Sequence, residues 1–231
     1  MNDKIIGIDI GGTKIRGILW NGKEVLKTQE IITPINLESF KLELNNLIKF
    51  LSQTNKIAIG ASGVVKGSKL IESTNIPYIK NFDFTTLETI SSDWKMLDND
   101  ARCFARAEYE INNTYNIENI FYITIGTGIG RAVVNNGEIL KIKKFEYFES
   151  WEKNYQKIRD NEDNKALAKY LNEKILELVK PYNIQKVVVG GGMLNKPDFW
   201  SEFKNVSNLP IEKSKLGENA VAIGATMLFN N

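Results

Sequence analysis

One sequence pattern occurs twice in this chain, and this internal repeat limits the folds that the chain can adopt. Residues 8–22 read IDIGGTKIRGILWNG, and residues 123–137 read ITIGTGIGRAVVNNG. At a constant offset of 115 residues, identical or similar residues recur, and Arg16 corresponds to Arg131. This offset is far longer than the period of a solenoid, so we expect a duplicated domain within the 231 residues.

Both copies predict the same local structure. In each, an apolar strand enters a glycine turn, a second strand follows, and an Asn-Gly pair predicts a type I′ hairpin turn before a third strand. Another apolar strand ends in small residues in each half, at residues 57–63 and at residues 187–193. Apolar periodicity predicts helices over 37–53, from about 99 onward, over 150–180 with a polar interruption at 159–164, and over 215–229.

This order of elements predicts an α/β protein of two lobes with a central cleft. We place the N-terminal α/β lobe at residues 1–97 and the C-terminal α/β lobe at residues 98–231. The last helix, at about 215–229, is expected to pack back on the first lobe.

Two absences exclude whole classes of chemistry. The chain has no His and a single Cys, Cys103. Ser-His-Asp triads, Cys-His dyads, histidine zinc sites and disulfide frameworks are therefore impossible. A general base must be a carboxylate or a lysine with a lowered pKa, and a bound metal must have oxygen ligands, as Mg²⁺ does.

Composition and charge are those of a globular chain. Apolar residues make up 42% and charged residues 25%, and no apolar run is long enough to span a bilayer. We therefore expect no membrane partner. The first residues do not resemble a signal peptide, so the expected location is cytoplasmic. The net charge of +2 argues neither for nor against a nucleic-acid partner.

Two glycine-rich loops are the candidate phosphate-binding sites. They read Gly11-Gly12-Thr13-Lys14 and Gly126-Thr127-Gly128-Ile129-Gly130. Glycines allow main-chain N–H groups to approach an anion because no Cβ is in the way. A Walker A loop and a dinucleotide fingerprint both require a helix after the glycines, whereas strands are predicted here. Both loops are interpreted as β-hairpin phosphate loops, and the alternative is a pair of tight turns without a ligand.

Asp9 lies in the first strand, two residues before the first glycine loop. A carboxylate at this point is placed to hold Mg²⁺ through water. The alternative is that Asp9 only caps the turn.

These motifs resemble the two phosphate motifs of the ROK family of sugar kinases, which have the duplicated two-lobed actin-like ATPase (ribonuclease H-like) fold. Five further segments resemble family motifs in the same order: residues 59–65, 74–77, 99–108, 189–192 and 220–225. Two residues within these segments differ from the family motifs. Ser62 occupies a position where proline is usual, and Arg102 occupies a position where asparagine is common.

The resemblance implies an ATP-dependent kinase that transfers the γ-phosphate to the 6-hydroxyl of a hexose or N-acetylhexosamine. The residues implied for ATP and Mg²⁺ are Asp9, Gly11, Gly12, Thr13, Lys14, Gly126, Thr127, Gly128, Gly190, Gly191 and Gly192. Asp100 follows a predicted strand at 95–97 and is the implied general base, with plain N-capping as its alternative. Asn75 and Asn99 are the implied sugar-binding residues. A kinase of another small hydroxylated acceptor, and a binding protein without turnover, remain alternatives.

The segment between Leu140 and residue 150 departs from the family. ROK kinases carry a Glu-x-Gly-His motif and a zinc-binding Cys cluster there, and this shorter chain has neither, so we expect no zinc. Glu146 or Glu149 is the candidate sugar-binding carboxylate, and the alternative is a solvated charged loop. The apolar residues available to anchor the segment are Phe145, Tyr147, Phe148 and Trp151, and we expect Phe148 and Trp151 to point inward.

ROK repressors carry a helix-turn-helix before the first motif. Here that motif begins within ten residues of Met1, so no nucleic-acid partner is expected. The expected partners are the small-molecule sugar and ATP, and the resemblance allows a homodimer.

Overall fold

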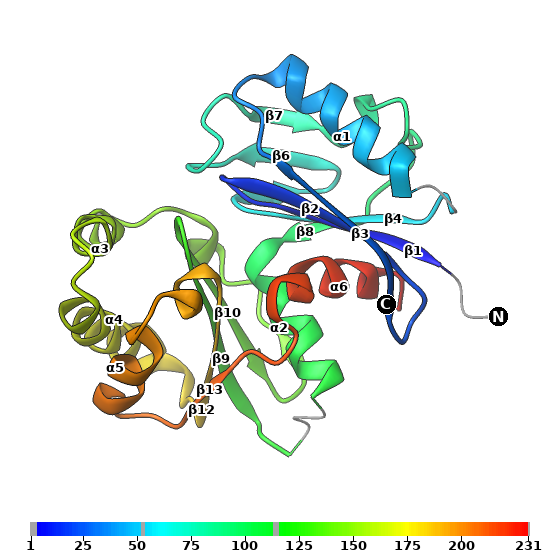
Figure 1. Cartoon of the computed structure of the whole chain (residues 1–231). Helices are drawn as coiled ribbons and strands as arrows, with labels where there is room; N and C mark the ends of the chain where they lie inside the picture. Colours follow the sequence, from blue (N-terminus) through cyan, green and yellow to red (C-terminus); the bar gives the residue numbers. More distant parts are fainter. Residues whose placement is uncertain (1–3, 52–53, 113–115, 231) are drawn as a thin grey trace. The chain divides into compact units, whose positions relative to one another are not determined.

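The chain folds into two compact units, which are shown in Figure 1. The computed structural model describes residues 4–51, 54–112 and 116–230. Unit 1 consists of Met1–Ala107 together with Asn219–Asn231, and unit 2 consists of Glu108–Glu218.

The division between the units falls ten residues later than the expected boundary at 97/98, within helix α2 (Asp100–Ile111). The reason is close packing of the first turns of α2 within unit 1. A Cβ placed on Gly224 would lie 1.8 Å from the main-chain oxygen of Cys103, and one on Gly60 would lie 3.1 Å from the Cys103 sulfur. These glycines let α2 pack tightly against its neighbours in unit 1.

Unit 1 is built on a five-stranded mixed sheet. Its strand order is β3 (Val25–Ile32), β2 (Lys14–Trp20), β1 (Ile5–Ile10), β4 (Ile57–Ala61) and β8 (Leu97–Asn99). Strands β1, β2 and β3 are antiparallel neighbours, whereas β1, β4 and β8 run parallel. Strand β8 ends two residues beyond the predicted strand at 95–97. A smaller sheet of β5 (Val64–Lys66), β6 (Lys69–Glu72) and β7 (Lys80–Asp83) and the 3₁₀ turn η1 (Phe84–Thr86) complete the region.

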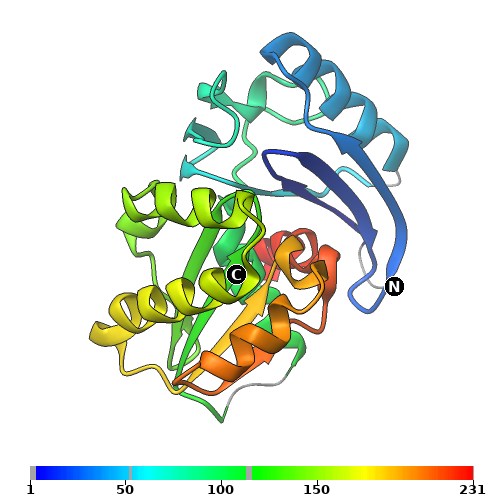
Figure 2. The same ribbon diagram turned by 60° about the vertical axis from the view of Figure 1, so that its left-hand side comes forward.

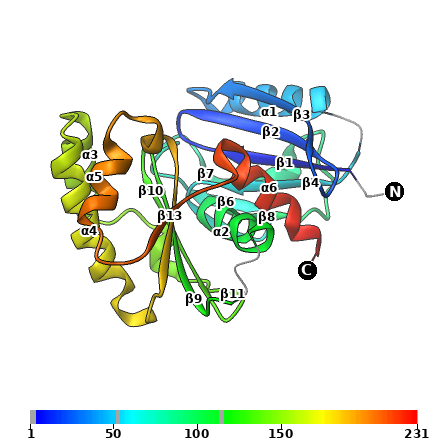
Figure 3. The same ribbon diagram turned by 60° about the horizontal axis from the view of Figure 1, so that its bottom comes forward.

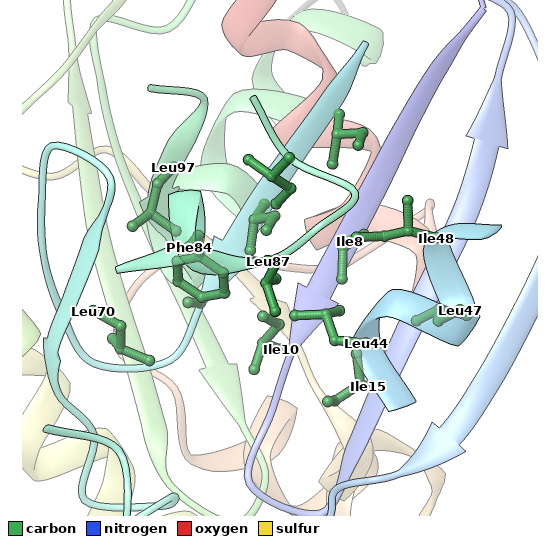
Figure 4. Close-up of a cluster of buried hydrophobic side chains, with 14 of the residues drawn as sticks. Ile8, Ile10, Ile15, Leu44, Leu47, Ile48, Leu70, Phe84, Leu87 and Leu97 are labelled. Carbon is green, nitrogen blue, oxygen red and sulfur yellow. The ribbon is translucent and has the colours of Figure 1, made fainter. Parts of the chain in front are cut away.

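The large sheet of unit 1 is covered on both faces. Helix α1 (Leu37–Leu51) lies on one face, and α2 with α6 (Ala220–Thr226) lies on the other, as Figure 3 shows. Apolar side chains of β1, β2 and α1 interlock in the core drawn in Figure 4, where Ile8 and Ile15 lie beside Leu44 and Leu47. The helical spacing of these leucines is the signal that predicted α1; residues 52–53 of that prediction lie outside the described residues.

Unit 2 repeats the strand order of unit 1. Its sheet consists of β11 (Glu138–Ile139), β10 (Ile129–Asn135), β9 (Asn119–Ile125), β12 (Lys186–Gly190) and β13 (Ile211–Lys213). The first three are antiparallel neighbours, and β9, β12 and β13 run parallel. Helices α3 (Trp151–Asp160), α4 (Asn164–Val179) and α5 (Phe199–Val206) gather beside this sheet in Figure 2. The predicted interruption at 159–164 is the break between α3 and α4, where the side chain of Asp163 caps α4 by accepting from the N–H of Ala166.

Short segments link these elements. They are the 3₁₀ turns η2 (Lys143–Glu146), η3 (Lys180–Tyr182), η4 (Gly192–Asn195), η5 (Gly217–Asn219) and η6 (Met227–Asn230). The predicted helix over 215–229 is therefore regular α-helix only in its centre, at α6. No helix within the described parts of the chain is both long and apolar enough to cross a membrane.

The two repeats differ in their turns. Asn136 and Gly137 both have positive φ and join paired residues of β10 and β11, so this turn is type I′ as predicted. At the first copy only Gly22 has positive φ, and Asn21 accepts hydrogen bonds from the N–H groups of Lys23 and Glu24. The type I′ prediction is wrong there, because the loop contains four residues, closed by the Asn21 side chain.

A shorter glycine loop also changes the register of the second hairpin. Ile10 pairs with Ile15 in unit 1, whereas Ile125 pairs with Ile129 in unit 2. One residue fewer in the loop shifts β10 by one position, and a shift of one turns a strand residue to the opposite face. Arg131 is therefore not the structural equivalent of Arg16, and it is buried where Arg16 is half-exposed.

Candidate functional site

The parallel strands of unit 1 end at one edge of the sheet, and the predicted polar residues gather there. Asp9 is the second-last residue of β1, Ser62 follows β4, and Asp100 follows β8. The N–H of Ser62 donates to the main-chain oxygen of Ile10 at 3.0 Å, so the ends of β1 and β4 are joined. In α/β sheets, ligands bind outside the carboxyl ends of the parallel strands.

A chain of side-chain hydrogen bonds leads to Asp100. The amide nitrogen Nδ2 of Asn75 donates to Oγ of Ser62 at 3.2 Å, and the Ser62 hydroxyl donates to the Asp100 carboxylate. Ser62 was noted only as a departure from the ROK motif. The structure shows that its hydroxyl contacts the candidate base, which sequence reasoning missed.

Three successive residues where β8 leads into α2 have three different environments. Asn99 accepts hydrogen bonds through Oδ1 from the N–H groups of Ala101 and Arg102, so Asn99 caps the helix. Asp98 is buried and pairs with Arg102 and Arg106 at 2.6 and 2.7 Å, and these arginines lower its pKa. Asp100 is neither the cap nor part of this pair, although it accepts from the N–H of Ala101 at 2.8 Å.

Both the oxygen and the nitrogen of the Asn99 side-chain amide form hydrogen bonds within the protein. In addition to capping, its Nδ2 donates to the main-chain oxygen of Gly63 at 3.0 Å, and only 4% of the residue is exposed. Gly63 needs to be glycine because its φ is +130° and a Cβ would lie 2.2 Å from the oxygen of Glu72. Asn99 thus ties the end of β8 to the turn after β4.

Asp9 and Asp100 both have raised pKa values, chiefly because they are buried. Burial, together with the neighbouring charge of Asp100, raises the pKa of Asp9 to about 8, although Arg16 and Lys14 oppose the increase. Burial also raises the pKa of Asp100, against hydrogen bonds from Ala101 and Ser62. A raised pKa in two neighbouring acids is the expected result where a cation would balance their charge.

The first glycine loop is packed against Asn75. A Cβ on Gly12 would lie 2.5 Å from the Asn75 Cβ, so only glycine allows this approach. Thr33 steadies the loop by donating through Oγ1 to the oxygen of Gly11 at 2.7 Å. Lys14 lies 3.0 Å from the carboxylate of Glu30, which also binds Arg16. Thus Asp9, the loop, Asn75, Asn99 and Asp100 all belong to unit 1.

The remaining glycines come together in unit 2. The second loop follows β9, and the Gly190–Gly192 turn begins at the last residue of the parallel strand β12, so both lie at the carboxyl edge of that sheet. Gly191 is required by packing, since its φ is +95° and a Cβ would lie 2.4 Å from the oxygen of Ile125.

Gly126 and Gly192 are not required by the protein's own packing. A Cβ on Gly192 would meet no atom within 4 Å, and one on Gly126 would meet only the nitrogen of Gly192, at 4.0 Å. Gly126 and Gly128 are not among the residues with positive φ either. Glycine backbone that faces open space without conformational need fits a surface on which phosphate groups lie.

Two residues of α3 hold the second loop. The hydroxyl of Tyr155 donates to the main-chain oxygen of Gly126, and Nη1 of Arg159 donates to the oxygens of Gly126 and Thr127 at 3.1 and 2.5 Å. The sequence predicts only a polar interruption at Arg159. Its spacing of four from Tyr155 puts both on one helix face, which was the one signal in the sequence.

The candidate sugar-binding segment is held by a buried arginine. Nη1 of Arg131 lies 2.5 Å from Oε1 of Glu149, and Nη2 donates to the oxygen of Tyr147 at 2.8 Å. The guanidinium also lies 5.5 Å from the ring centre of Phe145 and 5.4 Å from that of Trp151. Phe145, one of the expected anchors, is buried, whereas Phe148, which was expected to point inward, is only half-buried.

Glu149 is half-exposed, with 33% of its side chain accessible, and Glu146 lies in η2. Within the described residues, no cluster of three or more Cys, Asp and Glu side chains is arranged to hold a metal ion by itself. Mg²⁺ needs only one or two carboxylates when phosphate and water supply the other ligands. Asp9, half-buried and beside Asp100, fits that requirement.

Comparisons with known proteins agree on one family. The ROK family profile matches residues 5–144. The N-acetylmannosamine kinase of Haemophilus influenzae is 24% identical over an alignment that covers 96% of this chain and 94% of that protein. The N-acetylmannosamine kinase of Salmonella typhi is 30% identical over 58% of this chain and 48% of its own.

Two solved structures are similar over nearly their whole length. The ROK family glucokinase from Streptomyces griseus, in complex with glucose and AMPPNP, has a TM-score of 0.80 at 16% identity and covers 98% of this chain and 99% of its own. The inorganic polyphosphate/ATP-glucomannokinase from an Arthrobacter strain has a TM-score of 0.78 at 23% identity, with 98% of both chains covered. These likenesses confirm the expected fold class, the duplicated α/β fold of actin-like ATPases.

Proposed function

Because the chain belongs to the ROK family, we propose that it is an ATP-dependent sugar kinase. The acceptor is a hexose or N-acetylhexosamine, phosphorylated on its 6-hydroxyl. The similarity to N-acetylmannosamine kinases over 96% of the chain supports an N-acetylhexosamine as the first acceptor to test. The observation that carries the proposal is Asp100: a carboxylate at the end of β8, beside Asp9, that is oriented by Ser62 and relieved of capping by Asn99.

Asp100 is the proposed general base. It accepts the proton of the acceptor hydroxyl as that oxygen attacks the γ-phosphorus, and the bond from this phosphorus to the β–γ bridging oxygen breaks to release ADP. A carboxylate with a raised pKa holds a proton more readily than an ordinary one, which suits a base near neutral pH. Burial therefore makes Asp100 a better base, and the Ser62 hydroxyl limits the increase and fixes the carboxylate's orientation.

The phosphate groups are proposed to lie on the glycine backbone of the two loops and of Gly190–Gly192. When bound, Mg²⁺ neutralises phosphate charge, and Asp9 would hold it through water. Lys14 adds positive charge beside the first loop, although Glu30 shares it at 3.0 Å. Asn75 and Asn99 are proposed to bind acceptor hydroxyls. Because the protein already occupies both ends of the Asn99 amide, Asn75 is the more accessible of the two.

Asp100→Asn tests the proposal. We expect turnover to fall at least about 10²-fold in an ADP-release assay, with ATP binding nearly unchanged, because only proton transfer is lost. The panel should contain N-acetylmannosamine, N-acetylglucosamine, glucose and mannose. Asp93→Asn is the matched control, since Asp93 is exposed and its carboxylate accepts from the nearby Ser91 hydroxyl.

Three results would contradict or change the proposed function. Near-normal turnover in Asp100→Asn would make Asp100 a structural residue. Turnover with a different hydroxylated compound, and with none of the sugars, would show another acceptor class. ATP binding by the natural sequence without turnover on any acceptor would show a binding protein.

A further inference from the structure

The main-chain oxygens of the second glycine loop are bound from one side by helix α3. Tyr155 is fully buried, and burial raises its pKa to about 12, so its hydroxyl keeps its proton and donates at neutral pH. Arg159 donates to the oxygens of both Gly126 and Thr127. Its other edge is bound by Asp160, which accepts from Nε at 2.9 Å and from Nη2 at 2.7 Å. The guanidinium is therefore fixed between its helix and the loop.

These contacts determine where the loop's N–H groups point. A peptide unit is planar and trans, so its C=O and the N–H of the next residue point in opposite directions. With the oxygens of Gly126 and Thr127 directed to Arg159, the N–H groups of Thr127 and Gly128 are directed away from α3. Hydrogen bonds accepted by the carbonyls also polarise these peptide units, which makes their N–H groups stronger donors.

The backbone beside these donors is open. Neither Gly126 nor Gly192 would place a Cβ against side chains of the protein. The loop therefore combines directed N–H groups, uncrowded glycine backbone at Gly126 and a nearby guanidinium, which together favour a multiply charged phosphate group.

We propose that Arg159 and Tyr155 are positioning residues that hold the second glycine loop in its phosphate-binding conformation. This inference rests on the proposed kinase function, because it names the residues that prepare one of its two phosphate loops. Arg159 acts chiefly through the two carbonyl groups that it binds, and its charge is secondary.

The experiment measures affinity for MgATP and MgADP by titration calorimetry, together with the KM for ATP, the KM for the sugar and kcat. Tyr155→Phe removes a single hydroxyl and conserves the packing of the ring. Arg159→Gln removes the positive charge and the planar guanidinium that donates to two carbonyl oxygens. Lys157→Gln is the matched control, because it removes one positive charge from the exposed face of the same helix.

We expect Arg159→Gln to weaken MgATP binding about tenfold or more and Tyr155→Phe to weaken it several-fold, while the sugar KM changes little. Lys157→Gln should bind as the natural sequence does. Arg159→Lys keeps the charge but lacks the fork that reaches two oxygens, so it should remain weaker than the natural sequence. In amide NMR spectra, the Thr127 and Gly128 resonances should shift on addition of MgADP, and less so in Arg159→Gln.

The inference is overturned if folded Arg159→Gln and Tyr155→Phe bind MgATP with unchanged affinity. It is also overturned if Arg159→Lys restores full affinity, since charge alone would then explain the effect. If the natural sequence binds no ATP, the proposed function and this inference both fall. If the natural sequence binds ATP and both variants bind it with the same affinity, the inference falls while the proposed function stands.

Discussion

Arg131 of β10 and Glu152 of α3 form an ion pair inside unit 2. Nη2 lies 3.0 Å from Oε1, and the two side chains are 1% and 4% exposed. The same Glu152 oxygen accepts the N–H of Glu149 at 3.0 Å, and Arg131 binds the Glu149 carboxylate. The segment for which the ROK resemblance implied a missing zinc brace is thus held by one buried arginine and two glutamates.

Removing Arg131 should destabilise the protein strongly. Arg131→Met leaves Glu152 buried without its partner, and breaking a buried pair in this way costs about 3–5 kcal/mol. Urea unfolding measures the loss. Lys174→Met, which breaks the exposed pair of Lys174 with Glu177 at 2.6 Å, should cost less than about 1 kcal/mol. The double variant Arg131→Met, Glu152→Met should recover part of the lost stability. If Arg131→Met loses no more stability than Lys174→Met, the buried pair does not hold the segment.

Glu149 is the favoured sugar-binding carboxylate of this segment. Arg131 holds Oε1, while Oε2 has no hydrogen-bond partner among the residues that the structure describes. We expect Glu149→Ala to raise the sugar KM about 10- to 100-fold and the ATP KM much less, because a hydrogen bond to a charged group is lost. Glu146→Ala should leave both unchanged. The opposite pattern would assign sugar binding to Glu146, the other carboxylate of the segment.

Ser62 should control the pH dependence of turnover. Its hydroxyl lowers the pKa of Asp100, so Ser62→Ala should raise that pKa. Because a general base works in its deprotonated form, the acidic limb of the kcat profile should move to higher pH. Ser73→Ala is a matched control, since the Ser73 hydroxyl is buried and unpartnered in the described structure. An acidic limb that stays in place in Ser62→Ala would separate Ser62 from the base.

Asp9 should make stability depend on pH in the absence of nucleotide. Its folded pKa of about 8 lies above the value of 3.8 for an unperturbed carboxyl. A raised folded pKa contributes stability that is complete below the unfolded pKa and is lost as the pH rises through the folded pKa. Asp9→Asn removes this term. The variant should therefore gain stability relative to the natural sequence between pH 5 and pH 9, measured by urea unfolding; parallel pH profiles would contradict this.

Two adjacent glycines should respond differently to alanine. Gly191→Ala should cost roughly 1–3 kcal/mol or more, because φ is +95°, ψ is 166° and the Cβ would lie 2.4 Å from a main-chain oxygen. Gly192→Ala has room for its Cβ and should fold normally. If phosphate lies on this turn, Gly192→Ala should nevertheless weaken MgATP binding. Thermal unfolding and calorimetry on both variants measure the two effects, and unchanged ATP affinity in Gly192→Ala would remove Gly192 from the phosphate site.

Much of the fold could be predicted from the sequence because the patterns that indicate it are local. The spacing of Leu44, Leu47 and Ile48 predicted α1, and the repeated strand-glycine-strand pattern predicted the two hairpins. Apolar periodicity reports which face of an element is buried, and this property does not depend on the partner. The strand end before Asp100 was misplaced by two residues, because pairing with β4, and not local composition, extends β8 to Asn99.

The candidate site could be predicted from the sequence only in part. The glycine loops and Asp100 stood out as motifs, whereas Ser62 was visible only as a departure within a motif and Tyr155 and Arg159 belonged to no motif. Each of these acts through a hydrogen bond to a residue at least 29 positions away in the sequence. Such contacts depend on how strands and helices are brought together, and a single sequence does not contain that information in local form.

The sequence by itself determined the duplication, the element types and the absence of histidine chemistry and of disulfide frameworks, because these follow from residue identity and short-range spacing. The tertiary structure decided the rest. One residue fewer in the second loop turned Arg131 into the core, although it aligns with half-exposed Arg16 in the repeat. There it meets Glu149 and Glu152, 18 and 21 residues later. Strand faces alternate with every residue, so a single-residue difference in a loop reverses burial, and only the paired register shows which face results.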